Sequence, residues 1–465
     1  MMNVIQSGFS TRRFFPRLRA AALGGAAVFL LAPLVAAKPE SSGHGYTVRE
    51  IVEDGSWNYR GRPVTALGGG KLFVSFVTSG GEAGIRSIHL QTGAVETAVL
   101  STPGIDMHNN PSFTFDSKGR VVVFYSIVGG YNDQKQVARG VRPHDVSEFE
   151  ILHDTLASEL TGNVGSQSAL WSDRNGRIFL QNYTVYGGAR RELLFLSEDD
   201  GETFRERTLW SFAFGGDYND RSYTLSFFDA ERGRLHFMAL DKNMEVPMSH
   251  GLYYVYYDAG EDRFFRADGQ PAFDWSDTPV TNGHDYLDVI ADPAGGHSRP
   301  FWSSINVDGE GNAYLTWGSR ENARGSGMVS GHVTEYWSRH VDGQWRHYPV
   351  GPRTGWRTGS HINPHDPREV YLPVTLDDQT TQIQKRRFDG ETGEFVKAAA
   401  VSPPMRIDIH DRQSPGVWAP SGPSHLADGD PGVVVWNYGR FSSQYQRAGG
   451  YKGAIMMGIG KSRPE

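Results

Sequence analysis

Arginine, histidine and asparagine recur at matching places along this chain of 465 residues, about 12 residues before each copy of a repeated turn. An arginine guanidinium binds a carboxylate through two parallel hydrogen bonds, and a histidine exchanges a proton near neutral pH. Together these residue types predict a site that holds an anionic group and moves a proton beside it. The positions are Tyr59 and Arg60, His108 to Pro111, Gly165 to Gln167, Asp220 to Tyr223, Ser298 to Pro300, Arg357, and Trp418 to Ser421.

The repeated turn has the form Asp-x-x-Gly, usually followed by a basic residue and then by an alternating apolar run. The steps between its copies are 49, 57, 57, 78, 57 and 63 residues, which is the spacing of blades in a β-propeller. We therefore predict an all-β, seven-bladed β-propeller with four antiparallel strands per blade over residues 58–465. The long fourth step predicts an inserted loop over residues 267–297. The copies lie near Lys71, Arg120, Arg177, Arg234, Asn312, Glu369 and Gly432.

The first 37 residues differ from the rest of the chain. Arg12 and Arg13 precede an apolar stretch, and Val35-Ala36-Ala37 offers the small residues of a cleavage site. This pattern predicts a twin-arginine signal peptide over residues 1–37, with an ordinary secretory signal as the alternative. Residues 38–57 are expected to form a loop that leads into the first blade. The protein is then expected to be periplasmic or secreted, with no membrane segment after cleavage.

Composition excludes several classes of function. The chain has no cysteine, so it forms no disulfide, carries no thiolate chemistry and has no cysteine-based zinc site. Its net charge is −7, and loss of the four arginines in residues 1–37 makes it −11. An acidic protein is a poor general ligand for nucleic acid, so an anionic ligand needs a local basic pocket. We expect no nucleic-acid partner. We also expect the protein to be a monomer.

In a propeller, the first strand of each blade lines a central channel, and the loops that lead into those strands form a rim. The matching positions therefore converge in space although they lie far apart in the sequence. Arginines interleaved with aromatic residues suit a carboxylate-bearing sugar, because aromatic faces stack on pyranose rings. By contrast, Ser197 to Phe204 fits the Asp-box, a structural hairpin. The candidates for substrate binding are Arg60, Asn109, Asn110, Tyr223, His250, Arg299 and Arg357.

The order of these motifs resembles the BNR-repeat-containing family over roughly residues 55–440. The resemblance rests on DMHNNPSFTFDSKGRVVVFYS, RSYTLSFFDAERGRLHFMAL followed by GLYYVYYD and RADGQPA, INVDGEGNAYLTWGS, EYWSRHVDGQW and DPREVYLPV. Characterised members include seven-bladed polysaccharide lyases that act on ulvan and on rhamnosyl-glucuronate glycans. The resemblance implies a secreted lyase that cleaves a uronate-containing glycan by β-elimination, with an anionic polysaccharide as its partner.

The resemblance also implies catalytic residues. A histidine at the start of the second blade would handle protons, and an arginine at the start of the fourth would neutralise the uronate carboxylate; His108 and Arg221 stand there. The family often has a second histidine in a phrase like Phe-Tyr-Ser-x-His, but this chain has Val128 at that position. Either the second proton transfer falls to Tyr183 or Tyr186, in the corresponding stretch of the next blade, or the linkage or the chemistry differs.

Two alternatives stay open. A glycoside hydrolase of the rhamnosidase or sialidase type would use the same rim, although a sialidase has six blades and needs an acidic partner that is not evident here. A non-catalytic glycan-binding propeller is the other, because the second histidine is missing. The chemistry requires no cofactor. We predict no metal site, and a structural metal ion is left open and unassigned.

Overall fold

The computed structural model describes most of the chain from residue 40 onward. Met1–Val35 separates from Ala36–Glu465 as a unit of its own, and the signal peptide over residues 1–37 lies outside the described residues and stays a prediction. In the described part, no helix is long and apolar enough to cross a membrane. The described residues are 40–41, 45–55, 64–104, 107–127, 135–160, 162, 164–165, 168–173, 175–186, 189–211, 222–241, 251–292, 300–320, 333–352, 359–376, 380–406, 432–440 and 452–460.

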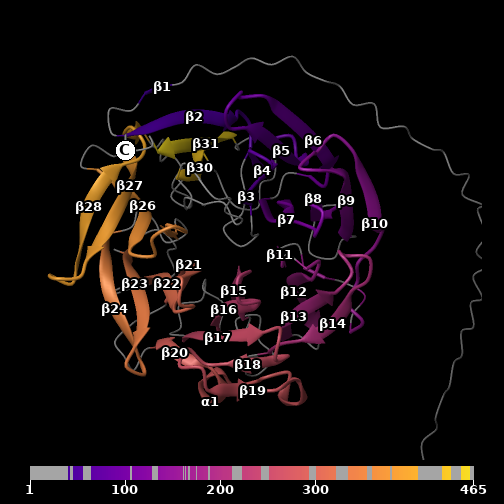
Figure 1. Cartoon of the computed structure of the whole chain (residues 1–465), viewed down its shortest axis with the longest axis vertical. Helices are drawn as coiled ribbons and strands as arrows, with labels where there is room; N and C mark the ends of the chain where they lie inside the picture. Colours follow the sequence, from indigo (N-terminus) through magenta and orange to yellow (C-terminus); the bar gives the residue numbers. More distant parts are fainter. Residues whose placement is uncertain are drawn as a thin grey trace, which may run out of the picture. The chain divides into compact units, whose positions relative to one another are not determined.

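Seven antiparallel sheets form a ring within the second unit (Figure 1). This confirms the predicted all-β, seven-bladed propeller with four antiparallel strands per blade. We number the sheets as blades 1 to 7. Blade 1 holds β3 (Thr65–Gly68), β4 (Lys71–Val77), β5 (Ala83–His89) and β6 (Val95–Ser101); blade 2 holds β7 (Ser112–Phe115), β8 (Arg120–Ser126), β9 (Lys135–Pro143) and β10 (Phe149–His153), after the 3-10 turn η1 (Met107–Asn109); blade 3 holds β11 (Ala169–Ser172), β12 (Ile178–Tyr186), β13 (Ala189–Ser197) and β14 (Arg205–Thr208).

The later blades follow the same plan, with additions. Blade 5 holds β21 (Phe301–Val307), β22 (Ala313–Arg320), β23 (Val333–Val341) and β24 (Gln344–Pro352); blade 6 holds β25 (His361–Ile362), β26 (Glu369–Thr375), β27 (Thr380–Asp389) and β28 (Glu394–Ala400), with β29 (Met405–Arg406) on β27; blade 7 holds β30 (Val433–Arg440), β31 (Lys452–Gly460), β2 (Tyr46–Val52) and β1 (Glu40–Ser41).

Blade 4 carries an ordered extension. The sequence predicts an inserted loop over residues 267–297, whereas the described part of this range forms two strands and two short helices. The rings of Phe264 and Phe273 stack at 4.2 Å, and Trp275 packs on Phe264 at 4.8 Å. These rings join the insertion to the hydrophobic cluster between blades 3 and 4. The elements are β15 (Tyr223–Asp229), β16 (Arg234–Leu240), β17 (Leu252–Asp258), β18 (Arg263–Phe265), β19 (Pro271–Phe273), η2 (Trp275–Asp277), α1 (Gly283–Tyr286) and β20 (Asp288–Ala291), which pairs with β17.

Blade 7 joins strands from opposite ends of the described chain. β2 pairs antiparallel with β31, which places Tyr46 opposite Gly460. The sequence predicts a loop over residues 38–57, whereas Tyr46–Val52 is a strand. Its apolar side chains face two neighbours: Tyr46 and Val48 pack toward blade 6, and Val52 packs toward blade 1. The partner strand lies about 400 residues away in the sequence, so no local pattern reveals the pairing.

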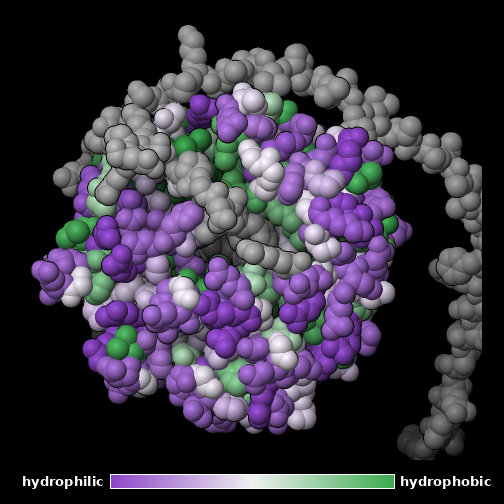
Figure 2. Space-filling model, viewed as in Figure 1, coloured by the Kyte–Doolittle hydropathy of each residue, from purple (hydrophilic) through white to green (hydrophobic). Residues whose placement is uncertain are grey.

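Each neighbouring pair of blades encloses one hydrophobic cluster, seven in the described residues. Phe73 of blade 1 meets Phe113 of blade 2, and Trp337 of blade 5 meets Leu372 of blade 6; all four are 0% exposed. Because both faces of each sheet are covered, inner strands such as β4 read as continuous apolar runs. Burying one phenylalanine contributes roughly 1.5–3 kcal/mol. Hydrophilic residues cover most of the face in Figure 2, with hydrophobic residues in small separate patches.

The repeated Asp residue explains why the turn motif recurs. Asp116 Oδ1 accepts hydrogen bonds from the backbone N–H groups of Lys118 at 3.0 Å and Arg120 at 2.8 Å, while Oδ2 accepts from Arg120 Nε at 2.7 Å. Asp173 bonds Arg177 in the same way. The carboxylate therefore closes the turn, and the basic residue four positions later neutralises it.

The predicted Asp-box is confirmed between β13 and β14. Asp199 Oδ1 accepts from the Thr203 N–H at 2.9 Å and lies 2.8 Å from Ser197 Oγ, and Phe204 packs against the cluster between blades 2 and 3. The next residue, Asp200, accepts from the Ser117 N–H at 2.9 Å and from its hydroxyl at 2.7 Å. Since Ser117 belongs to the inner turn of blade 2, this hairpin also joins two blades.

A buried histidine lies inside blade 4. His236 on β16 is 1% exposed, and its Nδ1 lies 2.6 Å from the hydroxyl of Tyr254. Burial lowers its pKa to about 4; the nearby Asp229 opposes this shift, while the guanidinium groups of Arg234 and Arg232 add to it. The ring of Tyr256 lies 5.5 Å away. The fold therefore holds this imidazole neutral.

Acid should destabilise the fold through His236. Its folded pKa is about 4, against 6.5 for an unperturbed histidine, so its contribution to stability is complete above the unfolded pKa and is lost as pH falls toward the folded pKa. His236→Gln, whose amide can still bond Tyr254, should remove about 3 kcal/mol of this loss. Guanidinium unfolding of both proteins between about pH 7 and pH 4 measures the difference. Parallel losses in the two proteins would contradict the assignment.

Removing an inner-turn carboxylate should destabilise a blade. Asp173→Ala leaves two backbone N–H groups and Arg177 without their acceptor, so we expect a loss on the order of 1–3 kcal/mol in chemical unfolding. Arg346→Gln is the matched control, because its ion pair with Asp342 joins side chains that are 53% and 80% exposed. The control should change stability by less than about 0.5 kcal/mol. Equal effects of the two changes would argue against a structural role for the turn.

Candidate functional site

The two ends of the blades' first strands differ in chemistry. We name the rim the segments that lead into these strands, and the turn face the Asp-centred turns that follow them. At the rim, Asn110 Nδ2 of blade 2 donates to Ser75 Oγ of blade 1 at 3.1 Å. Ser112 Oγ of blade 2 donates to the carbonyl of Ser168, just before β11 of blade 3, at 2.7 Å. Blade 2 is thus hydrogen-bonded near the rim to both of its neighbours.

His108, Asn109 and Asn110 form a buried group at the start of blade 2. His108 and Asn109 lie in η1, and the three side chains are 3%, 1% and 3% exposed. Asn109 Nδ2 donates to the carbonyl of Gly104 at 3.3 Å, which holds the turn. Among the described residues, Asn110 Oδ1 is buried with no hydrogen-bond partner. A buried acceptor of this kind is rare in a folded protein and suits a ligand donor.

Tyr183 lies at the rim of blade 3. It is 5% exposed and sits on β12, which runs past the end of its neighbour β11. Gly165 packs directly against the phenol ring: a Cβ added there would lie 2.1 Å from Tyr183 Cε1. The Gly165 N–H also donates to the carbonyl of Tyr183 at 2.8 Å. The chain leading into blade 3 therefore fixes one side of this ring.

The β12–β13 hairpin carries two arginine–tyrosine pairs on opposite faces. Arg190 lies over the ring of Tyr183, with 3.4 Å from Cζ to the centroid, and Arg191 lies over Tyr186 at 4.6 Å. Strand pairing puts Val185 opposite Arg190 and Thr184 opposite Arg191, so each pair is a diagonal contact within one face. The first pair is buried, whereas Tyr186 is 46% exposed.

Arg190 also contacts blade 4. Its Cζ lies 4.5 Å from the ring centroid of Tyr223, the first residue of β15. Its Nε donates to Glu192 Oε1 at 2.9 Å, and both side chains are at most 5% exposed. One guanidinium thus lies against two candidate site tyrosines from neighbouring blades, with its charge balanced by a buried carboxylate.

Tyr253 is held in its protonated form. Its pKa is raised first by burial and then by the carboxylate of Asp241, to which its hydroxyl donates at 3.0 Å. Burial likewise raises the pKa of Tyr254 and Tyr256. These three hydroxyls of blade 4 therefore stay protonated and are poor proton donors.

A buried lysine stands across the hairpin from Ser126. Lys135, the first residue of β9, is 0% exposed, and its Nζ donates to Ser126 Oγ at 2.7 Å. Ser126 is two residues before Val128, where the family often has its second histidine; Val128 itself lies outside the described residues. The register β7–β8–β9 places Ser126 and Lys135 at the rim end of blade 2. This end of the blade therefore carries a buried lysine side chain.

Several predicted residues lie outside the described residues: Arg60, Arg221, His250, Arg299 and Arg357. Of the fourth blade's rim segment the structure describes Ser222 and Tyr223. Ser222 Oγ is buried and has no hydrogen-bond partner among the described residues. Together with Asn110 Oδ1, it gives the rim two buried polar atoms with spare hydrogen-bonding capacity.

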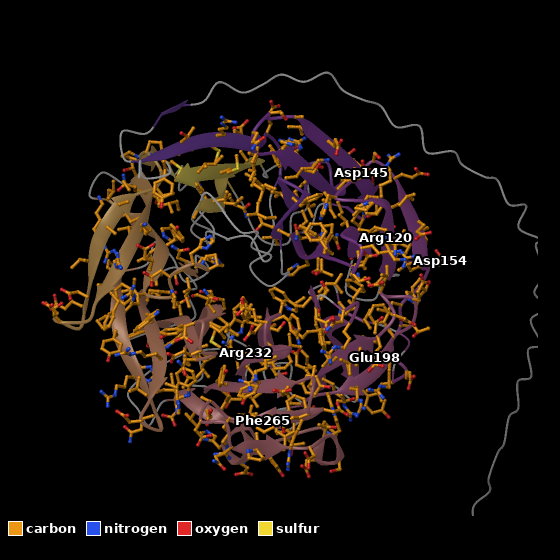
Figure 3. All side chains as sticks on the ribbon, in the orientation of Figure 1. Arg120, Asp145, Asp154, Glu198, Arg232 and Phe265 are labelled. Atoms are coloured by element: carbon orange, nitrogen blue, oxygen red, sulfur yellow. The ribbon has the colours of Figure 1, made fainter. Side chains whose placement is uncertain are left out.

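A cavity of about 510 Å³ lies at the turn face. Its lining includes Arg232, which donates to Asp229 Oδ2 at 3.0 Å and to the carbonyl of Gly309. Figure 3 shows Arg232 on the inner side of the ring, while Glu198 lies toward the outer edge. Within the described ranges, no group of three or more histidine or acidic residues is placed to hold a metal ion. The cavity is also lined by the turn carboxylates of Asp116, Asp173, Asp229 and Asp308.

Comparison with known proteins places this chain in a family. The pattern described as a BNR repeat-containing family member matches residues 71–353, more than half of the chain. The chain belongs to the BNR repeat-containing family. Comparison with curated proteins gives no match.

Solved structures similar to this BNR propeller include polysaccharide lyases. A PL25 ulvan lyase bound to -[GlcA(1-4)Rha3S]- aligns with a TM-score of 0.66 and 15% identity, over 90% of this chain and 96% of that one. Polysaccharide lyase Uly1 aligns with a TM-score of 0.55 and 12% identity, over 89% and 94%. An α-L-arabinofuranosidase from Fusarium graminearum aligns with a TM-score of 0.45 and 10% identity, over 76% and 93%. The likeness to the two lyases shows that this BNR propeller shares their fold.

Three buried charged residues of this BNR propeller escape sequence reasoning: Arg190, Glu192 and Lys135. Arg190 and Glu192 sit two positions apart beside Arg191, and such a run normally marks a solvated strand face. The one available signal is the spacing of Arg190 and Glu192, which share a face of the strand with Tyr183. The residues that follow Lys135 in the sequence give no indication that its side chain is buried.

Gly165→Ala should displace the ring of Tyr183, because the added Cβ would lie 2.1 Å from Cε1. We expect a loss of stability of roughly 1–3 kcal/mol from overpacking, measured by chemical unfolding. Gly390→Ala is the matched control, since a Cβ there meets nothing within 4 Å. A Gly165→Ala protein as stable as the control would show that the ring moves freely.

Proposed function

We propose that this BNR propeller is a polysaccharide lyase that cleaves a uronate-containing glycan, ulvan-like or rhamnosyl-glucuronate, by β-elimination at its rim. The observation that carries the proposal is the buried His108-Asn109-Asn110 group, in which Asn110 Oδ1 has no hydrogen-bond partner among the described residues. A proton-exchanging side chain stands there beside a polar atom that is ready for a sugar hydroxyl.

The elimination needs a cation, a base and an acid. The cation stabilises the uronate carboxylate while the base removes the C5 proton. The electrons of the C5–H bond form the C4=C5 double bond as the C4–O bond breaks, and the acid protonates the departing glycosidic oxygen. We assign the cation to Arg221 and the two proton transfers to His108 and Tyr183.

Burial favours Tyr183 over Tyr186 for this role. Tyr183 is 5% exposed beneath Arg190, and it belongs to the blade next to His108. Tyr186 is 46% exposed on the opposite face of the hairpin. A proton-transfer group must be held in one geometry, and Tyr183 is packed against both Gly165 and Arg190. Asn109, Asn110, Tyr223, Arg60, His250, Arg299 and Arg357 are the proposed substrate-binding residues.

Charge supports the rim as the end that meets the polymer. The turn face collects the carboxylates of Asp116, Asp173, Asp229 and Asp308 around its cavity. Arginines of the same turns pair with the first three, so this face offers an anionic sugar no excess of positive charge. The rim is predicted from the sequence to carry Arg60, Arg221, Arg299 and Arg357, whereas the charge of Arg190 is already balanced by Glu192. A polyanion would therefore dock on the rim.

The nature of the substrate is taken from a relative and from the rim residues. The PL25 ulvan lyase of the same fold holds -[GlcA(1-4)Rha3S]-, which contains a uronate. Its identity to this chain is 15%, so the polymer cleaved here is part of the proposal. We also propose that the protein is exported by a twin-arginine signal to the periplasm or beyond, acts as a monomer and needs no cofactor.

A glycoside hydrolase on the same propeller is the second candidate. Val128 replaces the second histidine of the family, and a hydrolase of the rhamnosidase type would use His108 without it. A glycan-binding propeller without catalysis is the third. The reaction products separate the three candidates, because only elimination creates an unsaturated uronate.

Incubation with ulvan or with a rhamnose-glucuronate polymer should generate the ultraviolet absorbance of an unsaturated uronate. His108→Ala and Arg221→Ala should abolish it, because each removes a group that acts in the transition state. Tyr183→Phe should lower kcat by roughly 100-fold or more, as loss of a proton-transfer group does. Arg346→Gln, on the exposed surface of blade 5, is the control and should keep full activity.

New reducing ends without this absorbance would overturn elimination in favour of hydrolysis. Binding of the polymers without either product would leave a binding propeller.

A further inference from the structure

The β12–β13 hairpin distinguishes one arginine from its neighbour. Arg190 is 5% exposed and touches the rings of Tyr183 and Tyr223, while Arg191 touches the exposed ring of Tyr186. We propose that Arg190 is a positioning residue, which acts through Tyr183 by holding the tyrosine ring at the rim in its reactive geometry. This inference rests on the proposed lyase function, because it assigns Tyr183 a proton transfer.

Arg190 is anchored by a chain of buried hydrogen bonds that crosses two blades. Glu192 accepts from Arg190 Nε at 2.9 Å through one oxygen and from Gln181 Nε2 at 3.1 Å through the other. Gln181 Oε1 in turn accepts from the hydroxyl of Ser226 in blade 4 at 3.2 Å. That hydroxyl accepts from Trp171 Nε1 of blade 3 at 3.0 Å. Every member of this chain is at most 5% exposed.

The energetics of such a pair favour a positioning role. A buried ion pair adds little net stability, because desolvation of two charges offsets their attraction, whereas removal of one partner leaves a buried charge. Apolar residues would fill the same space with no such penalty. What the pair supplies is direction: the planar guanidinium, with Nε bonded to Glu192, has one orientation, and its face lies 3.4 Å from the centroid of Tyr183.

The phenol ring of Tyr183 is therefore enclosed on two sides. Gly165 approaches one part of the ring so closely that a Cβ has no room, and Arg190 covers the ring face. The same guanidinium lies 4.5 Å from the ring of Tyr223, which follows Arg221 by two residues in the sequence. One side chain thus sets the position of a proton-transfer residue in blade 3 against the start of blade 4.

Arg190→Lys tests this role, because it keeps the positive charge but removes the planar guanidinium group. Displacement of a reacting group by about 1 Å costs as much as 100-fold in rate, so we expect kcat on the uronate polymer to fall by roughly 10- to 100-fold while KM changes by less than about threefold. Arg191→Lys is the matched control, because it makes the same change at the next residue, whose side chain lies on the opposite face of the hairpin over Tyr186. It should leave both constants within about twofold.

A double-mutant cycle separates positioning from general damage. If Arg190 acts through Tyr183, then Arg190→Lys should have no further effect on kcat once Tyr183→Phe has removed the hydroxyl. A merely structural role would lower activity equally in both backgrounds. Additive effects in this cycle would overturn the proposal.

A second measurement is independent of activity. The protein is labelled with fluorotyrosine, and the fluorine NMR resonance of Tyr183 is identified by its loss in Tyr183→Phe. Arg190→Lys should shift and broaden this resonance, and Arg191→Lys should leave it in place. An unchanged resonance in Arg190→Lys overturns the proposal, whatever the activity. If wild type cleaves no polymer, the lyase function fails, and the resonance still decides whether Arg190 holds the ring.

Glu192→Gln covers the case in which Arg190→Lys does not fold. It keeps the shape of the side chain and removes the charge that holds the guanidinium. It should lower kcat and broaden the same resonance, in the same direction as the arginine change. Wild-type kcat together with a wild-type resonance in a folded Glu192→Gln protein would overturn the proposal.

Discussion

The packing of each blade against its two neighbours is the interaction on which this propeller depends. Seven apolar clusters lie between the blades in the described residues, and each draws side chains from two sheets. With no cysteine in the chain, no covalent link supplements them. A blade cannot bury both faces alone, so its stability is shared with the blades on either side.

This shared packing leaves the two ends of the strands free for different tasks. At the turn face, the aspartate carboxylates accept hydrogen bonds within their own turns, as Asp116 does from the backbone N–H and Nε of Arg120. Asp200 adds a link from one blade to the next. At the rim, polar side chains are buried without being fully used, as Asn110 Oδ1 and Ser222 Oγ show among the described residues. The polar side chains of the turn face therefore serve mainly to hold the fold, whereas those of the rim keep hydrogen-bonding capacity for a ligand.

The seven-bladed ring could be predicted from the sequence because its turn motif depends on contacts between residues close together in the chain. An aspartate that bonds the backbone two and four residues later can be recognised from spacing alone, and the spacing counts the blades. The strand Tyr46–Val52 could not be placed in this way, because its partner is at the far end of the chain. At the site, His108 and Asn110 could be proposed from their position in the repeat. Arg190 and Glu192 could not, because a charged pair on a strand looks the same in sequence whether it faces water or a protein core.

The pairing of β2 with β31 has a consequence for how the molecule comes into being. Tyr46–Val52 is synthesised before any of blades 1 to 6, yet its hydrogen-bonding partner, Lys452–Gly460, is made about 400 residues later. Until β31 is made, this early strand lacks its partner in the sheet, and the unpaired edge can form hydrogen bonds with other strands. The ring can be sealed only after the ribosome has finished Gly460. Completion of the propeller therefore waits for β31, so a strand that is made early is among the last to be paired.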